Sequence, residues 1–267
     1  MHMTSLRRRL LAATLPAALL LAACGDDDDD AAATTTTEET GSDAVSVAFT
    51  APADGDHIAG AVHLVMSATG LTIEPAGEVH EGAGHFHVIA DDGCVEPGAA
   101  VARDADHVHF GKGQTEGTIY LGPGEHELCL QPGDGEHVAL DATDTVSITV
   151  GVESREDWCG VVGETDELFT TTDNSSDEFA VKQAAYEGIT RLIAQLTAAI
   201  DEVDADARDA VGAALAEASE IAQTFVDAAD AAAAQTALET RFGTQGAQPD
   251  PTAAEWIRDT CGVDIDS

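Results

Sequence analysis

Two short repeats, in which histidine alternates with an apolar residue, constrain the fold of this chain more than any other feature. The first runs from His85 to Val88 (HFHV) and the second from His107 to Phe110 (HVHF). Successive side chains of an extended strand point to opposite faces. Each repeat therefore predicts a strand that packs its apolar residues into a core and presents two imidazoles on the other face.

The region around these repeats, residues 44–151, has the pattern of a β domain. Short apolar-alternating runs are separated by turns rich in Gly, Pro and Asp, and no helical periodicity lies between them. This pattern favours an immunoglobulin-like β-sandwich. The predicted strands are 45–49, 62–67, 85–90, 118–121, 125–131 and 145–150.

Residues 152–267 have a different character and predict a small helical bundle. A polar stretch follows Gly160, and from Ile189 onward apolar residues recur at steps of three and four through two helices. A last helix is expected after Pro251 and includes Trp256. We interpret the apolar stripe of these helices as a core rather than as a groove for a partner.

The N-terminus has the pattern of an export signal, and we expect residues 1–23 to be a lipoprotein signal peptide. A basic head at Arg7–Arg9 precedes an apolar run that is too short to span a bilayer. The run ends in Leu-Ala-Ala-Cys24, which resembles the lipobox of bacterial lipoproteins. We therefore expect export, lipidation of Cys24 and anchoring to the outer face of the cytoplasmic membrane. An ordinary signal peptide is the alternative, and the Sec and twin-arginine routes both stay open.

Residues 24–43 and the overall charge limit the partners of the chain. The segment contains five consecutive aspartates and no apolar periodicity, so we expect a disordered acidic tether. The whole chain has 50 acidic and 11 basic residues, a formal charge of −39. This charge disfavours nucleic acid as a partner. We interpret it as a halophile-like surface, or else as attraction of cations, and expect a monomer whose envelope protein partners are unknown.

Four cysteines remain after Cys24, an even number in an oxidising compartment. They allow three pairings. We expect Cys94–Cys129 and Cys159–Cys261, because each pair then lies within one compositional region. The alternative, a cysteine metal site, is disfavoured because no C-x-x-C spacing occurs.

The two repeats also predict a metal centre. Phe86 and Val88 belong in the core, so His85 and His87 should face outward, on the same side as Cys129 of a neighbouring strand. The second repeat lies in a segment that can fold back over this face. Imidazole is a ligand for copper and zinc. The predicted ligands are His85, His87, His107 and His109, with His80, Glu81 and Glu127 as possible additional ligands.

Two other interpretations of the histidines stay open. They could form a structural polar network with nearby carboxylates, or a face that binds a small ligand or a protein. The remaining histidines of the β region are interpreted as strand or turn residues: His57, His63, His126 and His137.

Several spaced motifs resemble the bacterial domain-of-unknown-function family numbered 4399, over roughly residues 45–151. The resemblance implies an exported β-sandwich whose signature is these histidines, and it implies no established activity. Cys94 and Cys129 depart from the family pattern. The helical region lies outside it and is only loosely similar to helical tails of actinobacterial lipoproteins that end in Cys-Gly. The motifs are Gly82-x-Gly84-His85-x-His87, Asp106-His107-x-His109-Phe110-Gly111-x-Gly113-Gln114-Thr115-Glu116, Pro123-Gly124-x-His126-x-Leu128 and Gly133-Asp134-x-x-His137.

No motif of an enzyme accompanies these features. Gly-x-Ser-x-Gly, a P-loop and His-Glu-x-x-His are absent from the sequence, and lipidation and pairing leave no free thiol. The sequence therefore predicts a lipid-anchored, cell-envelope binding protein, without enzymatic activity, that holds copper or zinc on its histidine face. The alternative is a non-catalytic structural or interaction module in which the histidines form a polar network.

Overall fold

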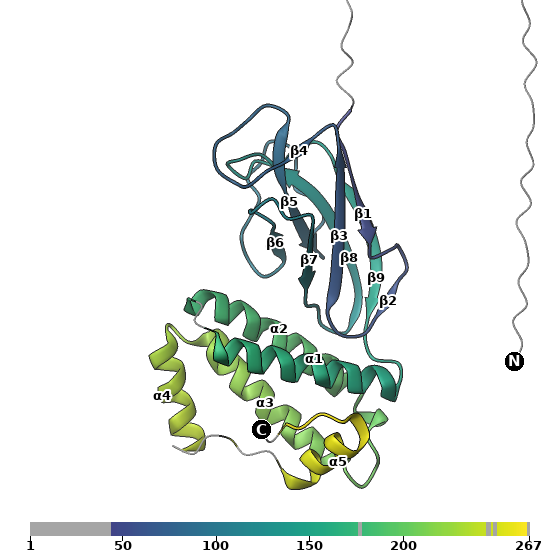
Figure 1. Cartoon of the computed structure of the whole chain (residues 1–267), viewed down its shortest axis with the longest axis vertical. Helices are drawn as coiled ribbons and strands as arrows, with labels where there is room; N and C mark the ends of the chain where they lie inside the picture. The colour runs from purple at the N-terminus through teal and green to yellow at the C-terminus, as the bar shows by residue number, and fades with distance from the viewer. Residues whose placement is uncertain (1–43, 176–177, 244–246, 248–249, 266–267) are drawn as a thin grey trace, which may run out of the picture. The chain divides into compact units, whose positions relative to one another are not determined.

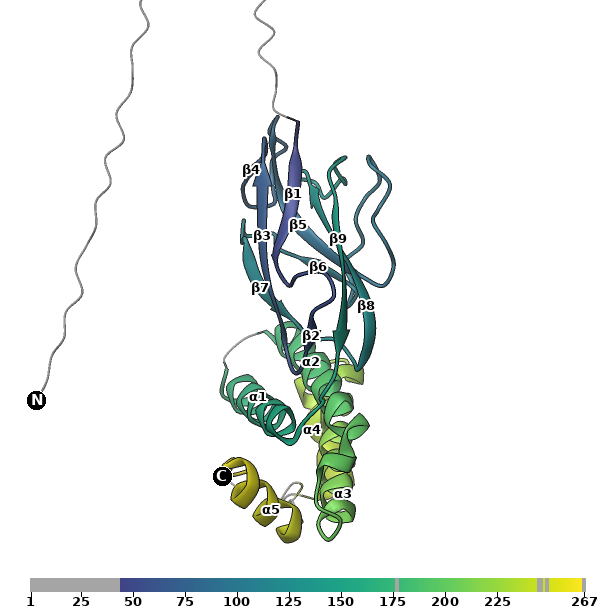
Figure 2. The same cartoon turned by 90° about the vertical axis from the view of Figure 1, so that its right-hand side faces the viewer.

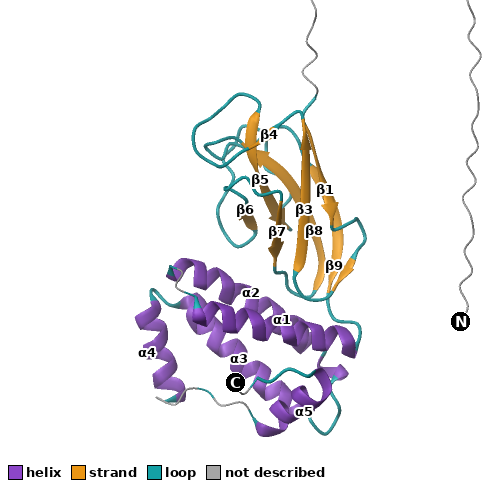
Figure 3. Ribbon diagram, in the orientation of Figure 1, coloured by secondary structure: helices purple, strands orange, loops and turns teal. Residues whose placement is uncertain are grey.

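The computed structural model describes residues 44–175, 178–243, 247 and 250–265 (Figure 1). The predicted signal peptide, the tether and Cys24 lie outside the described residues. Strands come first along the described chain and helices follow (Figure 3). The predicted succession of a mainly β region and a helical region is therefore confirmed.

The strands form two sheets (Figure 2). The first sheet has the order β1-β3-β7 and the second the order β2-β9-β8-β5-β4, with β6 paired to β5. The first sheet consists of β1 (Ser46–Ala51), β3 (Val62–Thr69) and β7 (Glu116–Ile119). The second consists of β2 (His57–Ile58), β4 (Thr72–Ile73), β5 (Ala83–Ala90), β6 (His107–His109), β8 (Gly124–Gly133) and β9 (Asp144–Val150).

The core between the sheets follows from the alternation of the strands. Phe86 and Val88 of β5 and Leu128 and Leu130 of β8 are completely buried in one apolar cluster, which also includes Leu64 of the first sheet. The arrangement is not the exact immunoglobulin one, which pairs sheets of four and three strands. Here β2 and β4 are short strands that join the second sheet in parallel to β9 and β5.

The first part of the helical region forms a helix that the sequence did not predict, α1 (Arg155–Asn174). The polar stretch after Gly160 belongs to α1, which Ser154 caps by accepting a hydrogen bond from the Asp157 amide. Buried Trp158 and Val161 attach this helix to the apolar cluster of the bundle. The helices are α1 (Arg155–Asn174), α2 (Phe179–Ala198), α3 (Arg208–Asp227), α4 (Ala231–Phe242) and α5 (Pro251–Cys261), with a 3-10 turn η1 (Ile200–Glu202).

Two disulfides are present, Cys94–Cys129 in the β region and Cys159–Cys261 between α1 and α5. These are the pairs that the compositional regions suggested. None of the described helices is long and apolar enough to cross a membrane.

Side chains of α2 hydrogen-bond to loops of the β region. The Gln195 amide is completely buried; it accepts from the Gly60 N–H and donates to the carbonyls of Gly60 and Leu121. Arg191 donates to the Tyr120 carbonyl at 2.7 Å.

The boundary expected between residues 151 and 152 stays a prediction; β9 ends at Val150 and α1 begins at Arg155.

Candidate metal centre

Strand β5 positions the first two imidazoles of the site. In the antiparallel ladder with β8, His85 lies opposite Gly133 and His87 lies opposite Gln131. Directly opposed residues point to the same face of a sheet. Because Phe86 points into the core, His85 and His87 lie together on the outer face of the second sheet.

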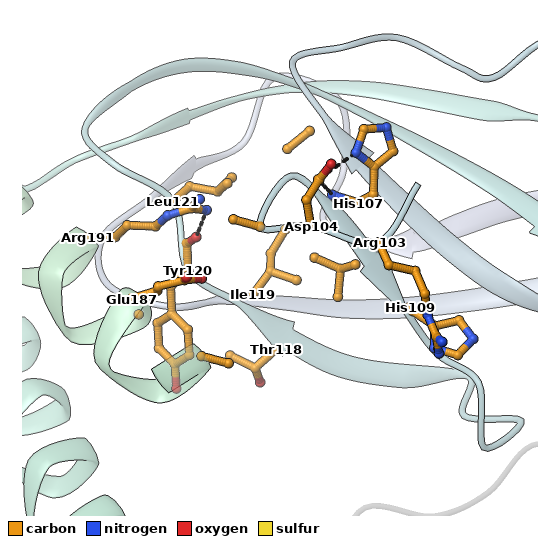
Figure 4. Close-up of a pocket in the computed structure, with 15 residues that line it drawn as sticks. Arg103, Asp104, His107, His109, Thr118, Ile119, Tyr120, Leu121, Glu187 and Arg191 are labelled. Atoms are coloured by element: carbon orange, nitrogen blue, oxygen red, sulfur yellow. Dashed lines mark hydrogen bonds and ion pairs between the residues drawn. The ribbon is translucent and has the colours of Figure 1, made fainter. Parts of the chain in front are cut away.

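Strand β6 adds one further imidazole to this face. His109 is paired with His87, whereas His107 is paired with Ile89, one pleat further along β5. The His107 ring instead lies beside Asp104, with 2.7 Å between Nδ1 and Oδ1 (Figure 4). The structure therefore brings His85, His87 and His109 together but does not bring His107 to them.

The fourth imidazole comes from His137, which the sequence interpretation treated as a turn residue. It lies in a tight turn after β8, where an Asp134 side-chain oxygen accepts hydrogen bonds from the amides of Glu136 and Val138. His137 has a φ of 69°, a conformation that is uncommon for residues other than glycine. The spacing Gly133-Asp134-x-x-His137 was the available signal, because an aspartate three residues earlier favours such a turn.

The four rings form one cluster, which we call the histidine centre: His85, His87, His109 and His137. All six distances between ring centroids lie between 4.7 and 5.9 Å. The Nε2 atoms of His109 and His137 are 3.1 Å apart. Two imidazole nitrogens on one tetrahedral zinc ion would be about 3.3 Å apart, given Zn–N bonds of roughly 2.0–2.1 Å. One nitrogen each of His85, His109 and His137 lies within 4.8 Å of the others.

The inner part of the centre is buried, and its ring nitrogens are unpaired among the described residues. His85 and His87 have no exposed surface, and none of their four ring nitrogens has a hydrogen-bond partner among the described residues. The sequence predicted that both would lie on the outward face of the sheet, over which the segment of the second repeat can fold back. They do lie on the outer face, but the loops after β5 and β8 hydrogen-bond to each other around Ala99 and Ala139 and remove this face from water.

This environment keeps the imidazoles neutral. Burial, with the neighbouring imidazoles and Arg103, lowers the pKa of His85 to about 4 and that of His87 to about 3. Burial and the Arg103 guanidinium also lower the pKa of His109. At neutral pH the buried rings are therefore in the form that binds metal ions.

Two glycines make room for the rings. A Cβ atom on Gly111 would lie 1.9 Å from Cε1 of His109, and one on Gly133 would lie 2.8 Å from Cε1 of His87. Real Cβ atoms do not approach other atoms so closely, so any side chain at these positions would displace the ring.

Arg103 contacts the outer side of the centre. Its Nη2 lies 2.9 Å from Nδ1 of His109 (Figure 4). Both residues line a cavity of about 570 Å³, together with His107, Tyr120 and residues of α2. His109 is partly exposed there, in contrast to His85 and His87.

The residues predicted as additional ligands lie elsewhere. His80 is exposed and its Nδ1 lies 2.7 Å from Glu74 Oε1. Glu81 lies in an exposed turn before β5. Glu127 is exposed, and its backbone amide donates to Asp91 near the far end of β5.

The other histidines of the β region have their own positions. His126 lies 2.7 Å from an Asp91 carboxylate oxygen and 2.9 Å from the Gly122 carbonyl. His57 Nε2 lies 3.4 Å from a Glu153 carboxylate oxygen, and His63 is an exposed residue of β3.

Comparison with solved structures gives weak similarities. An endo-beta-1,4-mannanase from Thermotoga petrophila is 19% identical, with 41% of this chain and 20% of that chain covered and a TM-score of 0.25. The fibronectin(III)-like modules of Clostridium thermocellum CbhA are 18% identical, with 40% and 46% covered and a TM-score of 0.23. The matches thus span less than half of either chain. A comparison with curated proteins gives no match.

Comparison with family models gives one assignment, over the part of the chain that forms the histidine centre. The match covers residues 64–151, from within β3 to the end of β9, and includes all four histidines. This agrees with the family resemblance of the spaced histidine motifs. Residues 64–151 of this chain match the model of the family described as Domain of unknown function (DUF4399).

Proposed function

We propose that this protein binds a transition-metal ion, copper or zinc, at the histidine centre. The ligands would be His85, His87, His109 and His137. This set replaces His107 of the original prediction by His137, because His107 pairs with Asp104 while His137 lies within the cluster.

The observation that carries the proposal is the set of unpaired ring nitrogens of His85 and His87. Buried polar atoms in folded proteins almost always have a partner, and each one without a partner costs roughly 1–3 kcal/mol. A cation would bind the one nitrogen of each neutral ring that carries a lone pair, and would remove the cost of that nitrogen. The depressed pKa values of both rings support a ligand that needs neutral imidazole.

The donor set narrows the choice of ion. It consists of imidazole nitrogens, and Cys94 and Cys129 are joined in a disulfide, so no thiolate of this pair takes part. Imidazole suits zinc and copper, whereas calcium and magnesium prefer oxygen ligands. A near-tetrahedral arrangement would favour zinc, and a planar one copper(II).

We further propose that the protein acts in the cell envelope as a monomer, tethered by a lipid on Cys24, and that it binds rather than transforms its ligand. Disulfides persist in oxidising compartments, which supports a location outside the cytoplasm. The absence of nucleophile and hydrolase motifs from the sequence supports a binding role.

Isothermal titration of the metal-free protein with zinc and with copper(II) tests the proposal. We expect one ion per chain with a dissociation constant of micromolar or below, and loss of this binding in His85→Ala/His109→Ala. His107→Ala is the matched control, because His107 lies on the same short strand and face but outside the centre. Binding that survives the double substitution, or that is lost in the control alone, would refute the assignment.

The competing function is a structural module in which the histidines form a polar network. The contacts that favour it are Arg103 to His109 and His109 to His137. It predicts that His109→Ala lowers the melting temperature to the same extent with and without metal. The unpaired nitrogens of His85 and His87 are not explained by such a network.

A further inference from the structure

The outer nitrogen of His109 has an unusual partner for a metal ligand. A histidine that binds a metal through one nitrogen normally donates the proton on its other nitrogen to a carboxylate, a carbonyl or water. Here the atom beside His109 Nδ1 is Nη2 of Arg103, at 2.9 Å. A guanidinium has donors and no acceptor. Nδ1 of His109 must therefore accept this hydrogen bond.

This contact fixes the proton of the neutral ring on the other nitrogen. Neutral imidazole has one donor and one acceptor nitrogen, so His109 Nε2 carries the proton. That Nε2–H points to Nε2 of His137 at 3.1 Å. As long as Arg103 stays in place, His109 thus has no free lone pair for a metal ion, and its hydrogen bond also occupies a lone pair of His137.

We propose that Arg103 and the metal ion compete for His109, and that Arg103 thereby sets the affinity of the centre. The inference rests on the proposed function. When the ion binds Nε2 of His109, the proton moves to Nδ1 and the guanidinium must leave, both because it cannot accept that proton and because it repels a cation.

The surroundings allow this movement. Arg103 is exposed and lies on an irregular segment between β5 and β6. The cavity of about 570 Å³ is lined by Arg103 and His109 and also by the carboxylates of Asp104 and Glu187 (Figure 4). The released guanidinium can therefore turn into a solvent-accessible space that contains negative charge. Because His109 borders this cavity while His85 and His87 are fully buried, the ion would enter beside Arg103.

The test is a zinc titration of the whole protein, in competition with a chromogenic chelator, for Arg103→Met and for Lys112→Met. Hydrogen bonds to charged groups contribute about 1.5–3 kcal/mol, so Arg103→Met should bind zinc about tenfold more tightly or better. Lys112 is exposed, lies close to the same strand and has no described side-chain contact, so Lys112→Met should stay within about twofold of the wild type. This control removes the same charge without the contact to His109.

A second readout does not need the metal. In the metal-free wild type at pH 7.5, imidazole ¹⁵N shifts should show His109 protonated at Nε2, and Arg103→Met should shift the ring toward the Nδ1–H tautomer. Equal zinc affinities of wild type and Arg103→Met, or an Nδ1–H tautomer in the metal-free wild type, would overturn the role of Arg103 and leave the proposed function intact. Failure of all variants to bind zinc would overturn both.

Discussion

The outer face of the second sheet has two halves that differ in the hydrogen bonding of their buried polar side chains. In one half Gln131 is completely buried, and its amide bonds to the N–H and carbonyl of Val95 and to the carbonyl of Leu140. In the other half His87, directly opposite Gln131 in the ladder, is equally buried and has no partner for either ring nitrogen among the described residues.

The hydrogen bonds of Gln131 have a structural role in the fold, whereas the ring nitrogens of His87 have no such role among the described residues. Gln131 holds the loops after β5 and β8 against the sheet, a task that uses all of its described hydrogen bonds. The same is true of Gln195 at the junction with α2. The scaffold thus pairs these buried amides fully, whereas none of the ring nitrogens of His85 and His87 has a hydrogen-bond partner among the described residues.

The largest expected effect is stabilisation by the ion itself. Zinc at a thousandfold excess over its dissociation constant should raise the free energy of unfolding by about 4 kcal/mol, because it binds only the folded state. Urea denaturation with and without zinc measures this difference. The control His107→Ala should keep the gain, and His85→Ala/His109→Ala should lose it. An equal gain in the double variant would mean that zinc binds elsewhere.

The next effect compares the two halves of the face directly. Gln131→Leu leaves the Val95 amide and two carbonyls unpaired and should lower the free energy of unfolding by about 3 kcal/mol. His87→Leu in the metal-free protein removes no hydrogen bond and takes away two buried unpaired nitrogens, so it should raise that energy by about 1 kcal/mol or more. Guanidinium denaturation of both variants gives the comparison. A comparable loss in His87→Leu would show that His87 has a structural partner.

Acid should destabilise the metal-free protein through the buried rings. The pKa values of His85 and His87 are lowered to about 4 and about 3, below the unfolded value of about 6.5. Between these values the unfolded chain binds more protons, so stability falls as the pH drops below 6.5. The slope is about 1.4 kcal/mol per pH unit for each ring, and there is no penalty above that range. Unfolding curves from pH 7 to 5 should show a shallower decline in His85→Leu/His87→Leu.

A smaller effect should come from Gly111. The added methyl of Gly111→Ala would meet the His109 ring, so we expect zinc affinity to fall about tenfold and the free energy of unfolding to fall by about 1 kcal/mol. Gly122→Ala is the matched control, because a Cβ there has no atom within 4 Å. An unchanged zinc affinity in Gly111→Ala would indicate that His109 is not a ligand.

Local alternation explains why much of the β region could be predicted from sequence. The apolar residues of the first repeat, Phe86 and Val88, show which face of β5 points into the core. This prediction does not require the neighbouring strands to be known. By contrast, α1 was read as a polar stretch because few of its side chains are apolar. Its position depends on Trp158 and on the distant Cys261, which local periodicity does not contain.

The choice among the histidines depended on long-range pairing. His107 and His109 look equivalent in sequence, and only the register of β6 against β5 sets one beside His87 and the other beside Ile89. His137 reaches the centre through the Asp134 turn and through pairing of its backbone with Val101. Neither register nor loop pairing is encoded in a short motif, so the sequence did not place His137 in the cluster with the other rings.

The most direct test of the account is anomalous X-ray diffraction from crystals of the protein loaded with zinc. We predict one zinc peak per chain, bound by nitrogens of His85, His87, His109 and His137 at about 2.0–2.1 Å, with the Arg103 guanidinium away from His109. A peak on His107 or on the exposed His80, or no peak in crystals soaked at millimolar zinc, would contradict it.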